Sequence, residues 1–444
     1  MGFHHPVSLS LPLPLPHSPS TQRRRPSITP ISISVRFDDR SDTSDFRHLL
    51  SHCAHIQPIA ESSFLHRQQS LANALNALNA SAYIAEPGAS AAYFANISGS
   101  SWHLSERPLL LLVVPEARIS VLTPAFEETR ARLLPVPSLS AHGVFYPTWA
   151  EDADPYEIAV GALPLPRGDM DTDGSTIFVD GDVRHFIADG LAHAAPRTRV
   201  VSAPVEIRQI RERKSREELE ILKCANEVTV LAIRAVRDKL HIGIRESEAR
   251  RLLQRALASA GLRGGDGLVL FGENAALPHG SGTDRALGPS DLILIDSGGS
   301  LHGYESDVTR TFYLGESRPT RRHVKLWNLV REAQALAMDT AHAGTVTSAV
   351  DKAAREFLKR FGVAQYFTHR LGHGIGLEGH ESPYLRGGSD DIIQTGHTFS
   401  NEPGVYIEGE VGVRIEDCFY IDEDGKPVYL TIGVGGPPIH PWLV

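Results

Sequence analysis

The stretch DLILIDSGGSLHGYESDVTRTFYLG, residues 291–315, decides the fold of the second half of this chain. Its glycine-rich centre separates two runs of β-prone residues, which predicts a β-hairpin. A turn centred near residues 300–301 makes paired positions sum to about 601 and places Asp296 and Asp307 diagonally on one sheet face, about 7–8 Å apart. Taken alone, the hairpin allows two interpretations: two exposed acids, or two carboxylates that bracket cations. However, Asp296 ends an apolar run, where burying an unpaired carboxylate costs free energy.

A second hairpin is predicted from NEPGVYIEGEVGVRIED, residues 401–417. A turn at Gly409 makes paired positions sum to about 818 and sets Glu402 opposite Glu416. The Pro403–Gly404 step can disturb the register, so this pairing is approximate. The hairpin offers two more carboxylates on one face, and taken alone it is as ambiguous as the first.

A glycine-rich loop, HRLGHGIGLEGHE at residues 369–381, supplies histidines. Glycines on both sides of His373 allow its backbone to approach other groups closely. It is no HExxH zinc helix, because residue 384 is tyrosine and the glycines oppose a helix. His373 alone is more typical of a structural role, but four carboxylates accompany it: Asp296, Asp307, Glu402 and Glu416. This oxygen-rich set with one nitrogen predicts two divalent ions, with Mn²⁺ preferred and Co²⁺, Fe²⁺ or Zn²⁺ as alternatives.

Residues 206–444 are predicted to form an α+β domain around these elements, because helical segments are separated from antiparallel hairpins. Ser215 and Glu218 form a capping box at the start of a long helix. The expected helices are 218–240, 246–260, 321–343 and 347–361. The expected strands are 268–270, 292–296, 309–313, 405–407, 411–415 and 418–421.

Residues 44–205 alternate helical segments with short apolar runs and predict a smaller α/β domain. The expected helices are 64–79, 127–134 and 183–193, the expected strands are 82–84, 108–114 and 119–122, and 163–175 is a loop. This part of the sequence contains neither a glycine-rich phosphate loop nor a cluster of ligand residues at metal spacing, so we expect a supporting role.

The N-terminal tail, residues 1–43, differs in composition from the rest. Its first 36 residues hold four arginines, seven prolines, seven serines and no acid. The prolines oppose the amphipathic helix of a transit peptide, so a disordered extension is the favoured interpretation and an organellar targeting segment the alternative.

The composition of the chain excludes several classes of protein. With 444 residues, 41% of them hydrophobic and 22% charged, the chain is of ordinary globular composition. A net charge of −9 argues against nucleic acid as a partner, and no apolar run is long enough to span a membrane. The three cysteines, Cys53, Cys224 and Cys418, are scattered and odd in number, so they predict no disulfide framework and a reducing compartment. We therefore expect a cytoplasmic location, with mitochondria or another organelle as the alternative that the acid-free tail leaves open.

The motifs resemble those of the pita-bread metallopeptidases, family M24, in the branch of aminopeptidase P and prolidase. The ordered Asp-Asp-His-Glu-Glu ligand set of that family matches the five residues named above. The resemblance is strong over residues 215–430 and weaker before them; Ser290 replaces a glycine usual in the family. It implies an α+β pita-bread catalytic domain preceded by a creatinase/prolidase-type α/β domain.

The resemblance also implies how the ligands divide between two ions. Asp307 and Glu416 would bridge the ions, Asp296 would hold one of them, and His373 and Glu402 the other. A hydroxide shared by the metals would be the nucleophile, because metal binding lowers the pKa of water toward neutrality.

Catalytic and substrate-binding residues follow from the same resemblance. Glu402 would carry a proton to the leaving nitrogen, and His380 would donate a hydrogen bond to the developing oxyanion, with His279 nearby. The implied substrate-facing set is His279, His369, His380, Tyr406 and Arg414. For Arg414 the sequence leaves two roles open, contact with substrate or orientation of Glu416.

The function implied by the resemblance is hydrolysis of the bond between an N-terminal residue and a proline, in a homodimer. The substrate is a proline-containing peptide, and the sequence does not separate a dipeptidase from an aminopeptidase. Two alternatives stay open, a hydrolase of small C–N bonds on the same fold and a catalytically silent binding module. Silent relatives typically lack some of the ligands, and this chain has all five.

Overall fold

The computed structural model describes residues 43–140, 143–165 and 175–444. The predictions for the tail before residue 43 and for most of the loop 163–175 lie outside the described residues. These described residues belong to one compact unit. Within the described ranges, no helix combines the length and the hydropathy that a membrane span requires.

The first half of the described chain is built around a six-stranded mixed sheet in the order β4-β3-β2-β1-β5-β6. Its strands are β1 (Ala82–Ala85), β2 (Leu110–Val113), β3 (Ile119–Pro124), β4 (Thr148–Trp149), β5 (Thr176–Val179) and β6 (Arg199–Ser202). Its helices are η1 (Thr43–Leu49), α1 (Glu61–Ala77), α2 (Ala89–Ala95), η2 (Ala125–Glu127), α3 (Glu128–Ala131), α4 (Pro155–Gly161), α5 (His185–Ala194) and α6 (Val205–Glu212).

This sheet is buried on both faces, which explains its uninterrupted apolar runs. Tyr83 and Leu111 point into one core, together with residues of α1 and α2. Their sequence neighbours Ile84 and Leu112 point into a second core, together with residues of α4 and α5. The alternation follows from the period of two along a strand, and it confirms the predicted α/β character of this half.

The second half contains a four-stranded sheet, in which β10, β8 and β7 are consecutive and β9 pairs with β8, a five-stranded sheet β12-β11-β13-β16-β17, and the hairpin β14-β15. The first of these sheets is made of β7 (Arg263–Phe271), β8 (Ile293–Leu301), β9 (Tyr304–Glu305) and β10 (Val308–Phe312). The others are made of β11 (Gly372–Gly374), β12 (Glu381–Leu385), β13 (Thr398–Asn401), β14 (Gly404–Ile407), β15 (Val411–Arg414), β16 (Asp417–Ile421) and β17 (Pro427–Tyr429). The helices are α7 (Arg216–Arg237), α8 (Glu246–Ser259), η3 (Gly272–Ala276), α9 (Arg321–Thr340), α10 (Thr347–Arg360), η4 (Ala364–Tyr366) and η5 (Ile432–Val434).

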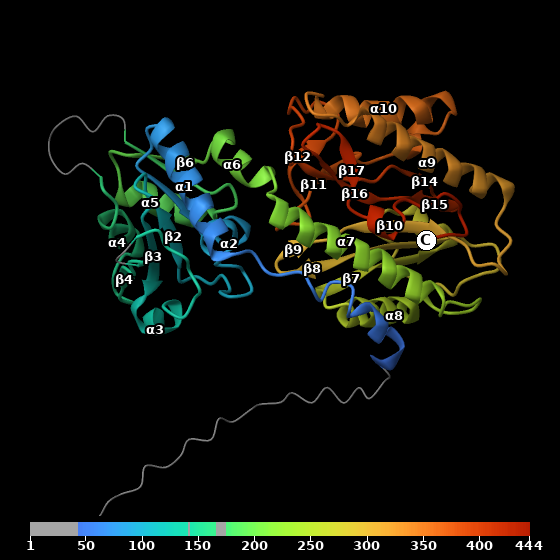
Figure 1. Ribbon diagram of the computed structural model, residues 1–444, viewed down its shortest axis with the longest axis horizontal. Helices are drawn as coiled ribbons and strands as arrows, with labels where there is room; N and C mark the ends of the chain where they lie inside the picture. The colour runs from blue at the N-terminus through green and yellow to red at the C-terminus, as the bar shows by residue number, and fades with distance from the viewer. Residues whose placement is uncertain (1–42, 141–142, 166–174) are drawn as a thin grey trace, which may run out of the picture. The chain divides into compact units, whose positions relative to one another are not determined.

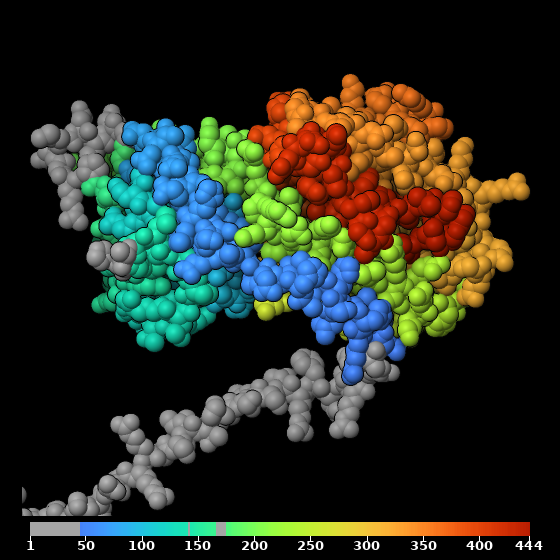
Figure 2. Space-filling view, in the orientation of Figure 1, coloured from blue at the N-terminus to red at the C-terminus, as the bar shows by residue number. Residues whose placement is uncertain are grey.

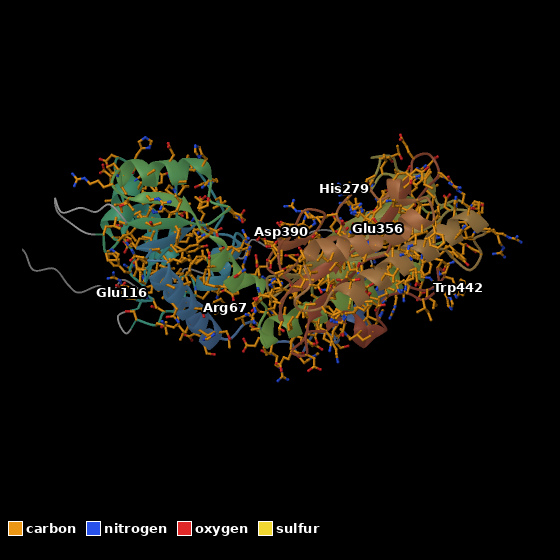
Figure 3. The ribbon with its side chains drawn as sticks, turned by 90° about the horizontal axis from the view of Figure 1, so that it is seen from above. Arg67, Glu116, His279, Glu356, Asp390 and Trp442 are labelled. Carbon is orange, nitrogen blue, oxygen red and sulfur yellow. A yellow bond between two sulfur atoms is a disulfide. The ribbon has the colours of Figure 1, made fainter. Side chains whose placement is uncertain are left out.

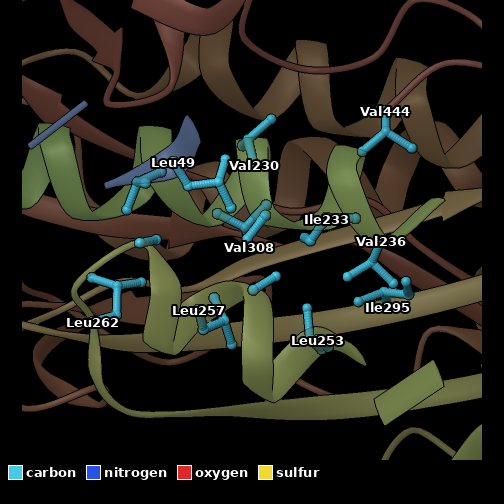
Figure 4. Close-up of a cluster of buried hydrophobic side chains, with 14 of the residues drawn as sticks. Leu49, Val230, Ile233, Val236, Leu253, Leu257, Leu262, Ile295, Val308 and Val444 are labelled. Carbon is cyan, nitrogen blue, oxygen red and sulfur yellow. The ribbon is translucent and has the colours of Figure 1, made fainter. Parts of the chain in front are cut away.

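Two pairs of helices flank these strands (Figure 1). On one side, Ile233 of α7 and Leu253 and Leu257 of α8 pack with Ile295 of β8, as Figure 4 shows. On the other side, α9 and α10 form a separate core with β13 to β16, in which Trp327 is fully buried. The strands that carry the candidate ligands are therefore held between two hydrophobic layers.

The start of α7 confirms the predicted capping box. Ser215 Oγ accepts a hydrogen bond from the amide of Glu218 at 3.4 Å, and Glu218 accepts one from the amide of Ser215 at 2.9 Å. The other oxygen of the Glu218 carboxylate accepts from Tyr304 at 2.9 Å. Arg67 of α1, labelled in Figure 3, lies 3.4 Å from Glu218, so this carboxylate also joins the two halves.

The register predicted for the first hairpin is wrong by four residues. The structure pairs Asp296 with Thr309 and Leu301 with Tyr304, so paired positions sum to 605. The turn consists of His302 and Gly303, with φ of 50° and 91°, because a two-residue hairpin turn of this kind requires positive φ at both positions. An error of four residues is even, so Asp296 and Asp307 keep the shared face that was predicted.

The register predicted for the second hairpin is confirmed. Asn401 pairs with Asp417, and Gly404 pairs with Arg414. Both pairs have the expected sum, and Glu402 and Glu416 lie between them, at the point where β13 and β16 give way to β14 and β15. The Pro403–Gly404 step interrupts the strand without shifting its register.

The cysteines, for which the sequence predicted no disulfide framework, include one bonded pair. Cys53 and Cys224 form a disulfide, while Cys418 is free and buried. Cys53 follows η1, whose Phe46 and Leu49 pack into the core of α7 and α8; Figure 2 shows this blue segment against the green helices. A separation of 171 residues leaves no sequence signal for the pairing, because tertiary packing alone brings the two sulfurs together.

The core between α8 and β8 supports a prediction about stability. Leu253 is fully buried, whereas Leu133 is 80% exposed. Leu253→Ala should reduce the free energy of unfolding by about 2–5 kcal/mol, because it removes buried methyl groups and leaves a cavity. The matched control Leu133→Ala should change it by less than about 0.5 kcal/mol. Denaturant unfolding of both variants checks this, and equal effects would contradict the assignment of the core.

Candidate metal centre

The five predicted ligands converge, although they come from five separate places in the chain. Asp296 lies on β8 and Asp307 directly before β10, His373 lies on β11, and Glu402 and Glu416 lie between paired strands. Ligand atoms of Asp296, Asp307 and Glu416 lie within 4.8 Å of one another, and so do those of His373, Glu402 and Glu416. Since Glu416 belongs to both groups, the arrangement suits two neighbouring cations. Ligation itself stays a prediction.

His373 is held as a neutral imidazole with one nitrogen directed at the carboxylates. Its Nδ1 lies 3.0 Å from the carbonyl oxygen of Gly374, which can only accept, so Nδ1 carries the proton. The free Nε2 lies 3.4 Å from Glu402 and 3.6 Å from Asp307. Burial lowers the pKa of His373 to about 3. A fixed tautomer with an available lone pair is what a metal ligand requires.

The carboxylates lie so close together that their ionised forms require positive charge nearby. Burial, together with the charges of neighbouring carboxylates, raises the pKa of Asp307 and Glu416 well above the usual values. Burial raises the pKa of Glu402 to about 8, and the charge of Asp296 adds to the effect. Glu416 Oε1 is buried without a hydrogen-bond partner. These residues therefore fit divalent cations, which would stabilise the ionised carboxylates and occupy the unpaired oxygen.

Arg414 and Thr309 orient two of the candidate ligands. Arg414 Nη2 donates to Asp296 Oδ2 at 2.6 Å, and its Nε donates to Thr309 Oγ1 at 3.1 Å. Thr309 in turn donates to Glu416 Oε2 at 2.7 Å. Arg414 is only 3% exposed, so the geometry favours the orienting role over substrate contact. Its direct partner is Asp296, and it reaches Glu416 through Thr309.

His369 and Tyr406 extend this network. Arg414 Nη1 donates to the Tyr406 hydroxyl at 2.8 Å, and the hydroxyl donates to His369 Nε2 at 2.8 Å. His369 Nδ1 donates to the carbonyl of Arg370 at 2.7 Å. Burial lowers the pKa of His369 to about 4, so this ring is neutral. Both residues lie beside the carboxylates, and their contact with substrate stays a prediction.

His380 and His279 are the exposed members of the predicted set. The His380 ring lies with its centroid 4.0 Å from that of His373, and a ring nitrogen of His380 lies within 4.8 Å of Asp307. His279, labelled in Figure 3, follows η3 and is exposed. A cavity of about 190 Å³ extends from His380 toward the first half of the chain, where Tyr83 and Asp180 line it.

Three residues that support the ligands were not predicted from the sequence. They are Thr309, Asn226 of α7, which accepts from the amide of Asp307 at 3.3 Å, and Ser400, which accepts from the amide of His373 at 3.1 Å. Strand alternation places Thr309 on the face of Asp307 and was a usable signal. Asn226 gave no such signal, because only packing of the helix against the sheet brings it there.

Thr309 provides a test of ligand orientation. Thr309→Val keeps the shape but removes the hydroxyl that joins Arg414 to Glu416, so the Mn²⁺ dissociation constant should rise about 10–100-fold. Thr123 is also a buried strand threonine, and its hydroxyl has no hydrogen-bond partner. Thr123→Val should therefore leave Mn²⁺ binding unchanged. Titration calorimetry measures both, and equal affinities for Mn²⁺ would contradict the role of Thr309.

Comparison with known proteins identifies relatives of the chain. The model of metallopeptidase family M24 matches residues 220–423. An uncharacterized peptidase from Schizosaccharomyces pombe is 39% identical over 397 residues, which are 86% of this chain and 84% of that protein. A Xaa-Pro dipeptidase from Pyrococcus furiosus is 35% identical over 221 residues, 49% of this chain and 63% of its own length. The match thus spans slightly less than two thirds of the dipeptidase.

Solved structures share the fold over most of the described chain. A dipeptidase from Mycobacterium ulcerans is 28% identical, with a TM-score of 0.75 over 84% of this chain and 97% of its own. A prolidase from Thermococcus sibiricus is 24% identical and has a TM-score of 0.73, and the match covers 84% of this chain and 98% of that prolidase. The predicted fold class is confirmed: a pita-bread α+β fold in the C-terminal half, preceded by an α/β half.

Proposed function

The chain belongs to metallopeptidase family M24, and from that premise we propose that it hydrolyses the bond between an N-terminal residue and a following proline. The supporting observation is the convergence of one neutral histidine and four carboxylates, all within reach of two neighbouring cations. The names of the Pyrococcus and Thermococcus relatives point the same way. We propose Mn²⁺ as the metal, since the donor set is rich in hard oxygen ligands.

The chain's own residues would prepare the reacting groups. Bound divalent cations would supply an acidified water and polarise the scissile carbonyl. Asp296, oriented by Arg414, would hold one side of the centre, while His373 and Glu402 hold the other. Because Arg414 and Thr309 bring hydrogen bonds to two carboxylates, the ligands are oriented before substrate arrives.

Glu402 is the proposed proton carrier. It would accept the proton of the attacking water and deliver it to the proline nitrogen, which has no hydrogen of its own while it is part of the amide. His380 would donate a hydrogen bond to the oxygen that becomes negative. Burial lowers the pKa of His380, so at neutral pH the ring acts as a neutral donor.

The cavity beside His380 offers a place for the substrate's first residue. Its volume of about 190 Å³ accommodates one side chain. The lining is polar, with Asp180, Arg211 and Glu378 among its residues. We therefore expect acceptance of polar as well as small first residues. Dimerisation and a cytoplasmic location stay predictions.

The proposed function predicts a defined substrate profile. The Mn²⁺-loaded protein should hydrolyse Ala-Pro or Ala-Pro-Ala but not Ala-Ala, because only the proline substrates fit the proposed specificity. Glu402→Gln removes a ligand and the proton carrier, and it should lower kcat about 10²–10⁴-fold. Chromatography of the released alanine measures both, and a series of longer Ala-Pro peptides separates a dipeptidase from an aminopeptidase.

A suitable control substitutes a carboxylate away from the centre. Glu116 (Figure 3) is exposed, and Glu116→Gln should leave turnover unchanged. If neither class of proline peptide is cleaved by the folded, metal-loaded protein, the proposal is wrong. Turnover of small non-peptide amides alone would instead favour a C–N hydrolase on this fold.

A further inference from the structure

A buried ion pair joins the connector between the two halves to the loop that carries His380. Lys214 lies between α6 and α7, and its Nζ is 2.5 Å from Oε1 of Glu381. Glu381 begins β12 and directly follows His380. The Lys214 and Glu381 side chains are 1% and 2% exposed, so water screens their interaction little.

The ammonium group of Lys214 has a single well-defined arrangement. Besides Glu381, it donates to the carbonyl oxygens of Arg211 and Glu212, each at 3.1 Å. These three acceptors match its three hydrogens. The backbone of Lys214 is fixed as well, since its amide donates to the carbonyl of Gly396 at 2.8 Å. Lys214 therefore offers Glu381 a rigid point of attachment.

The ion pair packs directly on the backbone of the His380 loop. A Cβ at Gly376 would lie 2.7 Å from both Glu381 Oε1 and Lys214 Cε, so only glycine allows this approach. The carbonyl of Gly376 also accepts from the amide of Glu305 at 2.8 Å, two residues before Asp307. The loop is thus held between the ion pair on one side and the first hairpin on the other.

The loop joins two residues of the centre. Residues 375–380 connect β11, which carries His373, to β12, and Gly374 pairs with Glu381 across that ladder. The His380 side chain is itself exposed, so its position beside His373 depends on the loop backbone. A further charge faces Glu381 and its loop: Arg211 lies 3.9 Å from Glu381 and 2.5 Å from Glu378, which is itself a residue of the loop.

We propose that Lys214 and Glu381 are positioning residues that hold His380 against the metal centre. This inference rests on the proposed function, in which His380 contacts the oxygen of the scissile carbonyl. Removing one partner leaves an unpaired buried charge, and the loop should shift to relieve it. A displacement of about 1 Å at a catalytic group can reduce the rate about 10²-fold. Arg211 remains near Glu381 and limits the effect.

The test uses Lys214→Met, Glu381→Gln and the double variant in the full-length protein. With Mn²⁺ and Ala-Pro, each single variant should lower kcat about 10–100-fold while KM changes less than about threefold, because His380 acts in the transition state. The double variant should lose less than the product of the single losses, because it leaves no unpaired charge. Glu381→Gln keeps the shape of the side chain and serves alone if Lys214→Met does not fold.

A second measurement does not depend on activity. Hydrogen exchange of the metal-free protein should speed up in the amides of residues 374–381 in each single variant, while the core strands keep their protection. The control is Arg184→Met, which breaks an ion pair of 2.6 Å with Glu86 in the first half of the chain. This control should change neither kcat nor exchange in the loop.

The outcomes separate the two proposals. A kcat within twofold of the parent in both single variants, with a lower unfolding temperature, would make the ion pair purely structural and overturn the inference. If the parent protein cleaves no Xaa-Pro peptide, the proposed function fails, and the exchange measurement still tests the loop. Unchanged exchange in residues 374–381 would then overturn the positioning role as well.

Discussion

The central constraint on this structure is the free-energy cost of keeping four carboxylates together in a largely buried site. Burial and mutual repulsion raise the pKa of three of them, Asp307, Glu402 and Glu416. Such a cluster persists only where positive charge and hydrogen-bond donors face it. Within the described residues, Arg414 supplies the closest cation, and divalent metal ions are the natural further source of charge in a metallopeptidase.

The two hydrophobic layers give this cluster its rigidity. The core of α7 and α8 and the core of α9 and α10 cover the strands from different sides. Each ligand lies on a strand or next to one, where the hydrogen-bonded ladder fixes the backbone. Close packing of both layers means that a ligand cannot move without displacing its neighbours, which suits a centre whose ligands must stay within a few ångströms of one another.

Supporting side chains link the cluster to both layers. Asn226 of α7 holds the amide of Asp307, and the buried Arg310–Asp417 pair, at 2.8 Å, lies behind Glu416 and contacts Gln334 of α9 through Asp417. Lys214 connects the centre to the connector between the halves. The N-terminal half is therefore linked to the candidate metal centre, since the segment that follows it contacts the loop of His380.

The sequence by itself determined the α/β and α+β characters of the two halves, the capping box at Ser215, and the ordered set of five candidate ligands. These follow from local rules, namely strand alternation, helix periodicity and the chemistry of residue types. The register of the second hairpin was also predictable, because Gly409 marks a single turn position. The first hairpin was not, because several glycines compete and only the two positive φ angles at His302 and Gly303 select the turn.

Only the tertiary structure decided which distant groups meet. The Cys53–Cys224 disulfide, the contact of Arg414 with Asp296, and the Lys214–Glu381 pair each join segments separated by more than a hundred residues. No periodicity in the sequence predicts such contacts, because they form only when helices and sheets pack against one another. The sequence thus determined the chemistry that is available, and packing decided the geometry in which that chemistry can act.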